Sequence, residues 1–165
     1  MKKLLAILIL LTPMILLAQK TINICDNNAT AFAYVSSPGT TTTTNTGEYY
    51  YLQGSFTNET MSGWAIVGDT LTYQGVEADI MIVLHGSFST DTNNTEITIG
   101  IKKNGVIEVN SQMTVEINST TDIANLSTCD VIRMKNGDNL SLWIKSDKAG
   151  AQITTETFTT TAFSR

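Results

Sequence analysis

Apolar and polar residues alternate with a period of two in several segments after residue 20, and this alternation predicts β-strands. The segments 95–103, 112–118 and 139–146 follow the pattern of a strand with one buried face. The residues that we expect to point into the core from these strands are Ile97, Ile99, Ile101, Met113, Val115, Ile117, Leu140, Leu142 and Ile144. No segment after residue 20 shows the apolar period of an amphipathic helix, so an all-β fold is expected.

The segment 78–90 differs from these strands because both of its faces are apolar. Ile80 begins an apolar series on one face, and Met81, Val83 and His85 occupy the other. A sandwich buries only one face of each sheet in its core, so the second face needs another cover. We therefore predict that Met81, Val83 and His85 belong to an oligomer interface.

Two Asn-Gly pairs separate apolar runs and predict tight turns. Asn104 and Gly105 both tolerate positive φ, so they indicate a β-hairpin between the strand before them and the run after them. Asn136 and Gly137 precede Asp138, whose carboxylate we expect to fix the second turn through backbone hydrogen bonds.

The N-terminus has the pattern of an exported protein. Lys2 and Lys3 precede an apolar run that ends at Ala18, which is the layout of a secretory signal peptide over residues 1–18. An uncleaved N-terminal anchor is the alternative interpretation. No membrane association is expected beyond this segment.

The rest of the chain divides into residues 19–47 and residues 48–165. In the first part we expect residues 21–35 to add a strand at one sheet edge. The polar, threonine-rich stretch 36–48 is expected to be a long loop or a hinge. Residues 48–165 are expected to form a single sandwich domain.

Composition favours β structure and excludes some partners. The chain has 27 threonines but only two prolines, and threonine fits a half-buried pleated sheet better than a helix. The formal net charge is −5 and there is no basic cluster, which argues against binding to nucleic acids or to anionic membranes. Many short strands with regular turns predict an antiparallel β-sandwich or a jelly roll.

Several short motifs follow one another in a fixed order from residue 70 onward. A Tyr-x-Gly motif precedes the long strand, a Lys-Asn-Gly hairpin follows that strand, and a Gly-Asp turn leads into the next-to-last strand. The residues concerned are Tyr73–Gly75, 80–89, Lys103–Gly105, Gly137–Leu140 and 158–163. This order resembles the C1q/tumour-necrosis-factor-like jelly roll, in the compact form seen in bacteriophage fibre and spike proteins and in exported bacterial proteins. The chain departs from animal C1q heads because it lacks their aromatic-rich closing motif and a collagen-like stalk.

The resemblance implies a homotrimer in which each sandwich gives one face of a sheet to a three-fold axis. Trp143 alternates with Leu142 and Ile144, so it points away from the core, toward a neighbouring copy or toward solvent. A surface tryptophan covered by a loop of the same chain is an equally good interpretation. The interface residues expected on this basis are Met81, Val83, His85 and Trp143.

The sequence carries little that points to catalytic chemistry. The sequence has no phosphate loop, nucleophile elbow or zinc motif, and it predicts no catalytic residues, no cofactor and no metal site. His85 is the single histidine, and a structural role is the simpler interpretation. Glu77 and Asp79 share one face of a strand, as the two carboxylates of a glycoside hydrolase could, but acids at a strand start are usually a solvated edge.

The two cysteines, Cys25 and Cys129, would meet an oxidising compartment after export. A disulfide between them would close a loop of about 100 residues and would contribute up to about 4.7 kcal/mol on the chain-entropy model. The alternative is two separate thiols that behave as small hydrophobic residues.

Three functional hypotheses follow. The first is a non-catalytic extracellular, cell-surface or virion-surface module, trimeric, that binds a receptor or a glycan or decorates a particle. The second is a monomeric, secreted bacterial adhesin or matrix protein. The third is a glycan-acting enzyme, which needs a carboxylate cleft that the sequence does not reveal.

Overall fold

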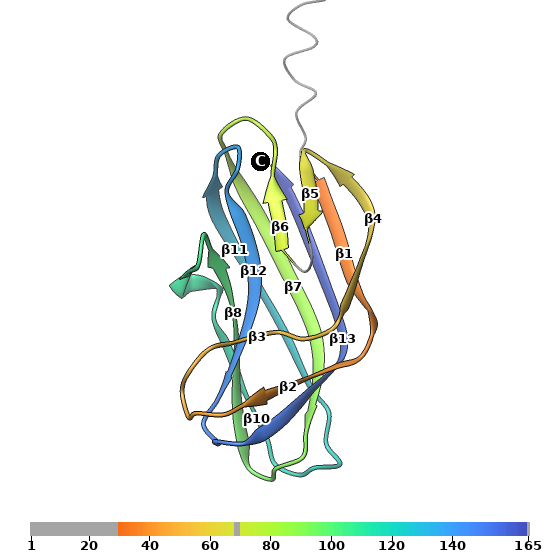
Figure 1. Cartoon of the computed structure of the whole chain (residues 1–165), viewed down its shortest axis with the longest axis vertical. Helices are drawn as coiled ribbons and strands as arrows, with labels where there is room; N and C mark the ends of the chain where they lie inside the picture. Colours follow the sequence, from red (N-terminus) through yellow and green to blue (C-terminus); the bar gives the residue numbers. More distant parts are fainter. Residues whose placement is uncertain (1–29, 68–69, 165) are drawn as a thin grey trace, which may run out of the picture.

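The computed structural model describes residues 30–67 and 70–164, which form two antiparallel β-sheets (Figure 1). Sheet A contains β1 (Thr30–Ser37), β2 (Gly39–Thr43), β4 (Ser55–Ser62), β7 (Ala78–Thr90), β11 (Ala124–Met134) and β13 (Ala151–Ser164). Sheet B contains β3 (Tyr50–Tyr51), β5 (Trp64–Val67), β6 (Thr70–Tyr73), β8 (Thr95–Lys103), β9 (Val106–Ile107), β10 (Met113–Ile117) and β12 (Asn139–Ser146). Within the described residues the one helical element is a short 3-10 turn, η1 (Val109–Ser111).

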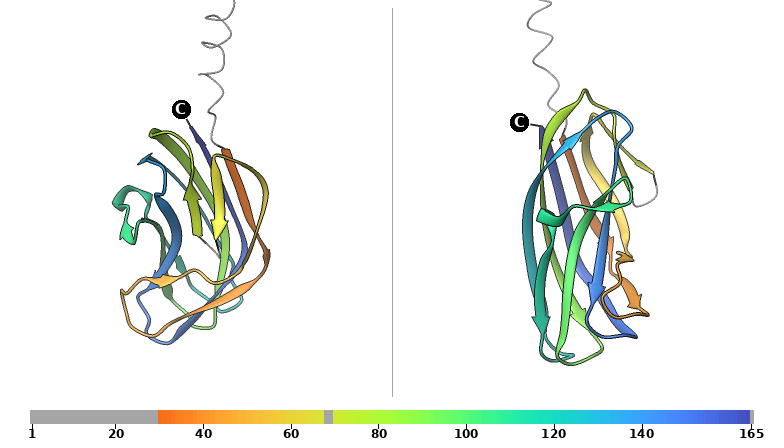
Figure 2. Two further views of the ribbon diagram at one scale, coloured as in Figure 1. Left: turned by 45° about the horizontal axis from the view of Figure 1, so that its top comes forward. Right: turned by 90° about the vertical axis from the view of Figure 1, so that its left-hand side faces the viewer.

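The strand order is that of a jelly roll, because neighbours in each sheet are mostly distant in the sequence. Sheet A has the order β11-β7-β13-β1-β4, and β2 also pairs with β13. Sheet B has the order β10-β8-β12-β6-β5, and β3 and β9 pair with β12 and β8. The two layers are visible in Figure 2. The predicted all-β, antiparallel jelly-roll sandwich is therefore confirmed.

Some predictions concern residues outside this description. They are the signal peptide or anchor at 1–18 and the partnership of Cys25 with Cys129, which stay predictions. Among the residues that are described, no helix has the length and apolar character needed to cross a membrane.

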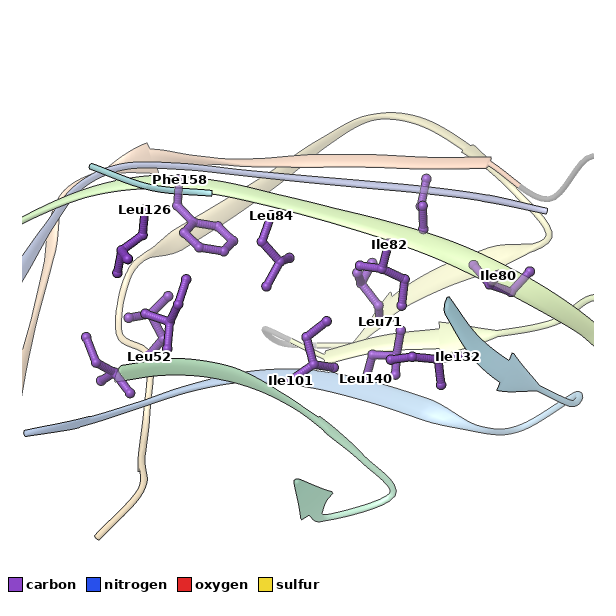
Figure 3. Close-up of a cluster of buried hydrophobic side chains, with 14 of the residues drawn as sticks. Leu52, Leu71, Ile80, Ile82, Leu84, Ile101, Leu126, Ile132, Leu140 and Phe158 are labelled. Carbon is purple, nitrogen blue, oxygen red and sulfur yellow. The ribbon is translucent and has the colours of Figure 1, made fainter. Parts of the chain in front are cut away.

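The core lies between the two sheets. Ile80, Ile82 and Leu84 of β7 point toward Ile101 of β8 and Leu140 of β12 (Figure 3). Of the nine residues predicted to face inward, six are almost fully buried: Ile97, Ile99, Ile101, Ile117, Leu140 and Ile144. Val115 and Leu142 are half-buried and pack against this core.

The expectation that Met113 would be buried is wrong, since its side chain is 38% exposed. Met113 pairs with Ile99, so both share one face of the sheet, but β10 is the edge strand of sheet B. Burial then rises along β10 toward Ile117. Alternation gives the direction of a side chain, whereas its burial depends on how far the opposite sheet extends.

The threonine-rich stretch 36–48 is not a simple loop, because it contains β2. Thr41 and Thr43 of β2 are buried while Thr42 between them is exposed. The Thr43 hydroxyl donates to the carbonyl oxygens of Lys148 and Ala151 at 3.0 and 3.1 Å, so its burial leaves no unpaired polar atom. Threonine thus forms a buried strand face that the apolar pattern does not reveal.

The predicted edge strand at 21–35 is also corrected. The described part of this segment belongs to β1, which lies between β13 and β4 and not at an edge of sheet A. The sandwich therefore includes residues from Thr30 onward, whereas the predicted domain begins at residue 48. Its N-terminal strands β1, β2 and β4 belong to sheet A, together with the long strand β7.

Both predicted Asn-Gly turns occur, but they connect strands differently. Asn104 and Gly105 have φ of 51° and 83° and close the hairpin between β8 and β9, as predicted. Gly137, with φ of 89°, lies between β11 of sheet A and β12 of sheet B. The second turn therefore carries the chain from one sheet to the other.

Asp138 joins these two turns. Its carboxylate accepts a hydrogen bond from the Lys135 amide at 3.0 Å, which confirms that it fixes its own turn. It also accepts one from the Asn104 side chain at 2.8 Å and lies 3.2 Å from the Lys103 ammonium. Lys103 in turn donates to the Arg133 carbonyl oxygen at the end of β11.

The side chain of Asp138 is only 4% exposed, yet it stays ionised. Burial alone would raise its pKa, but the hydrogen bonds from Asn104, from the Lys135 amide and from Lys103 outweigh this effect and lower the pKa of Asp138. The contribution of Asp138 to stability is therefore present above the ordinary carboxyl pKa of about 4. It is lost as pH falls through the lower, folded-state pKa.

We expect Asp138→Asn to lower the free energy of unfolding by about 1–3 kcal/mol at neutral pH, because hydrogen bonds to a charged, buried acceptor are weakened. The difference between wild type and variant should shrink as the pH is lowered below about 4. Urea denaturation across this pH range measures both effects. Glu108→Gln is the control, and parallel pH curves for wild type and Asp138→Asn would contradict the assignment.

A second prediction compares two apolar residues that face each other across β8 and β10. Ile99→Ala should cost about 2–5 kcal/mol, because it leaves a cavity between the sheets. Met113→Ala should cost less than about 1 kcal/mol, because its side chain is already partly in water. Equal losses by chemical denaturation would show that the sheets do not pack as described.

Candidate functional site

The outer face of sheet A is formed by the side chains of β7, β11 and β13 that point away from the core. Met81 lies between Val131 of β11 and Phe163 of β13 in the strand register. Val131 is 44% exposed, and Met81 and Phe163 are half-buried. This row of apolar side chains crosses three adjacent strands without a cover from the described residues.

The next rows of the same face continue without a carboxylate, lysine or arginine. Val83 lies between Cys129 and Thr161, and His85 follows in the row after it. The Glu156 carboxylate, which accepts a hydrogen bond from Ser89 at 2.7 Å, ends this uncharged region at the C-terminal end of β7. Between Glu156 and the row of His85, the outward positions carry hydroxyl and amide groups. They include Ser87, whose hydroxyl donates to Asn125 at 2.9 Å. Sheet A thus offers an uncharged surface, which we call the sheet-A face and which consists of Met81, Val83, His85, Cys129, Val131, Thr161 and Phe163.

The structure therefore brings together three of the four predicted interface residues. Met81, Val83 and His85 occupy successive outward positions of β7, and Cys129 is exposed beside Val83. Trp143 lies on β12 and points outward from sheet B, on the opposite side of the sandwich. One contiguous surface cannot include all four residues.

Trp143 belongs to a separate group on the outer face of sheet B, which we call the aromatic–lysine cluster. Its members are Tyr49, Tyr51, Lys102, Trp143 and Lys145. The Lys102 ammonium lies 3.5 Å from the centroid of the Trp143 ring, and Tyr51 meets that ring edge-on at 5.4 Å. Trp143 is therefore covered by side chains of its own chain, which agrees with the second of its two interpretations.

Strand pairing explains how these residues meet. β3 pairs with β12 so that Tyr51 lies opposite Trp143, and β8 pairs with β12 so that Gly100 lies on the other side of Trp143. A Cβ atom at Gly100 would lie 2.9 Å from the Ile107 side chain and 3.4 Å from Gln112. Glycine at this position lets the loop that carries η1 pack closely against the cluster.

Two lysines approach the same tyrosine ring in this cluster. Lys145 and Lys102 lie 5.0 and 5.9 Å from the Tyr49 ring centroid. The Tyr49 hydroxyl donates to the Gln112 side chain, and burial raises the pKa of Tyr49, so the hydroxyl stays protonated. Neither lysine forms an ion pair with a carboxylate of the described residues.

An arginine binds both carboxylates of the candidate pair, Glu77 and Asp79. Arg133 binds Glu77 and Asp79 with distances of 3.1 Å each, and all three side chains are exposed. Hydrogen bonds to Glu77 and Asp79 raise the pKa of Arg133. The pair therefore forms a charged border beside the sheet-A face. The described residues contain no group of three His, Cys, Asp or Glu side chains that could hold a metal ion.

Two hollows among the described residues are respectively too small and too open to hold a substrate firmly. A cavity of about 20 Å³ between the sheets is lined by residues such as Leu84, Leu142 and Thr160, and it has room for one water molecule at most. An open depression of about 540 Å³ lies over the loop between β10 and β11, with Glu116 and Asp122 among its lining residues. The two outer faces of the sandwich are therefore the better candidates for binding.

The sequence did not reveal which residues lie beside Met81 on the sheet-A face, or which tyrosines join the aromatic–lysine cluster. Val131 and Phe163 join Met81 only through strand pairing, which spans 50 residues or more. Tyr49 and Tyr51 alternate with inward-facing Leu52, and this short alternation was the available signal for β3.

Comparisons with known proteins support the fold. The sequence matches no model of a protein family and no curated protein. The structure of Eiger TNF from S. frugiperda is similar, with a TM-score of 0.59, 9% identity, and coverage of 84% of this chain and 93% of that chain. Murine APRIL at pH 8.5 and at pH 5.0 gives TM-scores of 0.54 and 0.55, with 11% and 12% identity over 81% of this chain and 98% of APRIL. Identities this low show the fold alone, which is the TNF-like jelly roll that the motifs predict.

Proposed function

We propose that this chain is an exported, non-catalytic module that forms a homotrimer and binds a receptor or a glycan at a cell or particle surface. The observation that carries the proposal is the sheet-A face, which has an apolar row of Met81, Val131 and Phe163 and contains no carboxylate, lysine or arginine. Uncovered apolar surfaces of this kind are typical of interfaces. Closed rotational symmetry would bury the same face on every copy.

The number of copies comes from the resemblance. A C1q/TNF-like jelly roll implies three copies around an axis, and the fold is similar to Eiger TNF and to APRIL. Placing the sheet-A face at this axis would cover Met81, Val83 and Val131 and would leave the exposed Glu77–Arg133–Asp79 group at its border. The engagement of both carboxylates by Arg133 supports a non-catalytic role.

We expect Val131→Asp to dissociate the trimer, because three carboxylates would be buried in an uncharged interface. Val83→Asp should act in the same way from the centre of the face. Light scattering of the mature chain should give three chain masses for the wild type and one for each variant. Circular dichroism confirms that the variants remain folded.

Val106→Asp is the matched control, since Val106 is 69% exposed and lies on β9 of sheet B. It should leave the mass at three chains. A wild-type mass of one chain at micromolar concentration would exclude the trimer and would favour the monomeric adhesin or matrix protein.

Cys129 offers an independent test of the same interface. In a Cys25→Ala chain, Cys129 is the single thiol and is exposed on the isolated sandwich. We expect its alkylation to be slower in the trimer than in the Val131→Asp monomer, because reaction needs an accessible thiolate. Equal rates would contradict burial of this face.

The Cys25–Cys129 disulfide is tested with the wild-type chain. With the chain denatured so that both thiols are accessible, we expect that no thiol is alkylated before reduction, and that two are alkylated after it. Two alkylated thiols before reduction would exclude the bridge.

A further inference from the structure

The aromatic–lysine cluster lies on the side of the sandwich that the proposed trimer leaves open. Trp143 and Lys145 belong to β12 and Lys102 to β8, and the outer face of sheet B is opposite to the sheet-A face. With the sheet-A face at the three-fold axis, each copy would present its cluster to the outside. A binding site on this outer face rests on the proposed function in this respect and specifies its partner.

The charge of the cluster points to an anion. The chain has a formal net charge of −5, yet Lys102 and Lys145 both approach Tyr49 and pair with no carboxylate of the described residues. By contrast, Lys103, Arg133 and Lys148 each lie within 3.4 Å of a carboxylate. The cluster therefore holds two cations whose opposite charge is not supplied by these parts of the chain.

The arrangement of the strands favours a saccharide over a peptide. An extended peptide usually adds to an open sheet edge through its main chain. At the cluster, β12 is paired on both sides, with β8 on one side and β3 on the other. Main-chain pairing is therefore closed along β12, and recognition by this strand must use side chains. The rings of Tyr49 and Trp143 and the amide of Gln112 suit the apolar faces and hydroxyl groups of sugar rings.

Lys102 connects the charge with the aromatic surface. Its ammonium lies over the Trp143 ring, and a cation–π contact at a partly exposed site contributes only about 0.5–1 kcal/mol. A charge-assisted hydrogen bond to a ligand carboxylate is stronger. A carboxylated sugar could therefore draw Lys102 away from Trp143 and place its own ring on the uncovered face.

We infer that the aromatic–lysine cluster is a binding site for saccharides that carry carboxylate groups. Lys102 and Lys145 bind the carboxylates, and Trp143 packs against a sugar ring. Because Lys102 leaves the indole, binding also changes the fluorescence of Trp143.

The experiment uses the mature trimer with tetragalacturonate as the probe and maltotetraose as its uncharged counterpart. Calorimetry and tryptophan emission should both report binding of tetragalacturonate, and affinity should fall as salt is raised. Maltotetraose should bind at least tenfold more weakly. Trp143→Phe should abolish the emission change, since Trp64, the second tryptophan, is buried elsewhere in sheet B.

Lys102→Met and Lys145→Met should each weaken binding about tenfold, which corresponds to the loss of one charge-assisted hydrogen bond. Lys148→Met is the control, because Lys148 lies beside Asp147 and outside the cluster. It should keep the wild-type affinity. Absence of tetragalacturonate binding, or binding that survives both cluster variants, would overturn the inference.

An acidic peptide of four glutamates separates saccharide recognition from simple attraction of negative charge. If this peptide binds as tightly as tetragalacturonate, the saccharide assignment is wrong. Light scattering of each cluster variant keeps this result distinct from the trimer itself. A wild-type trimer that does not bind the sugar refutes only the inference. A wild-type chain that binds the sugar as a monomer refutes only the assembly.

Discussion

The buried carboxylate of Asp138 holds the two sheets together at one end of the sandwich. Ionised groups are costly to bury, and this one is tolerated because the Lys135 amide, Asn104 and Lys103 all bind it. Lys103 also binds the carbonyl oxygen of Arg133 on the opposite sheet. These polar contacts fix how β12 starts beside β8. A shift of one residue would exchange the two faces of β12 and bring Trp143 into the core.

Much of this fold is predictable from the sequence because its central strands carry strong local signals. Ile97, Ile99 and Ile101 define the faces of β8 by alternation, and Asn104–Gly105 marks its end. The limits of β7 likewise follow from its continuous apolar pattern. Such signals fail for β2, since the hydroxyl group makes Thr43 look polar although its bonds to carbonyl groups allow complete burial.

The grouping of residues on surfaces was less predictable, because it depends on which sheet each strand joins. Alternation correctly placed Val83 and Trp143 away from the core, but the sequence does not tell that β7 and β12 lie in different sheets. The partner Tyr51 reaches Trp143 across about ninety residues of chain through the pairing of β3 with β12. Which strands pair over such distances depends on all the strands of the fold, so no short stretch of the sequence reveals it.

The hairpin at Asn104 also bears on the chemical ageing of the protein. An asparagine before glycine loses its side-chain amide readily, because the unhindered glycine nitrogen can attack the side-chain carbonyl group, and such residues are thermolabile. In the folded chain, Asn104 donates to Asp138 and accepts from the Asn139 amide at 2.9 Å, which restrains it from the geometry of that attack. Once deamidated, residue 104 would present a second carboxylate to Asp138, and repulsion would replace the hydrogen bond. Each molecule that ages in this way loosens the junction between its sheets, so unfolding and deamidation accelerate one another.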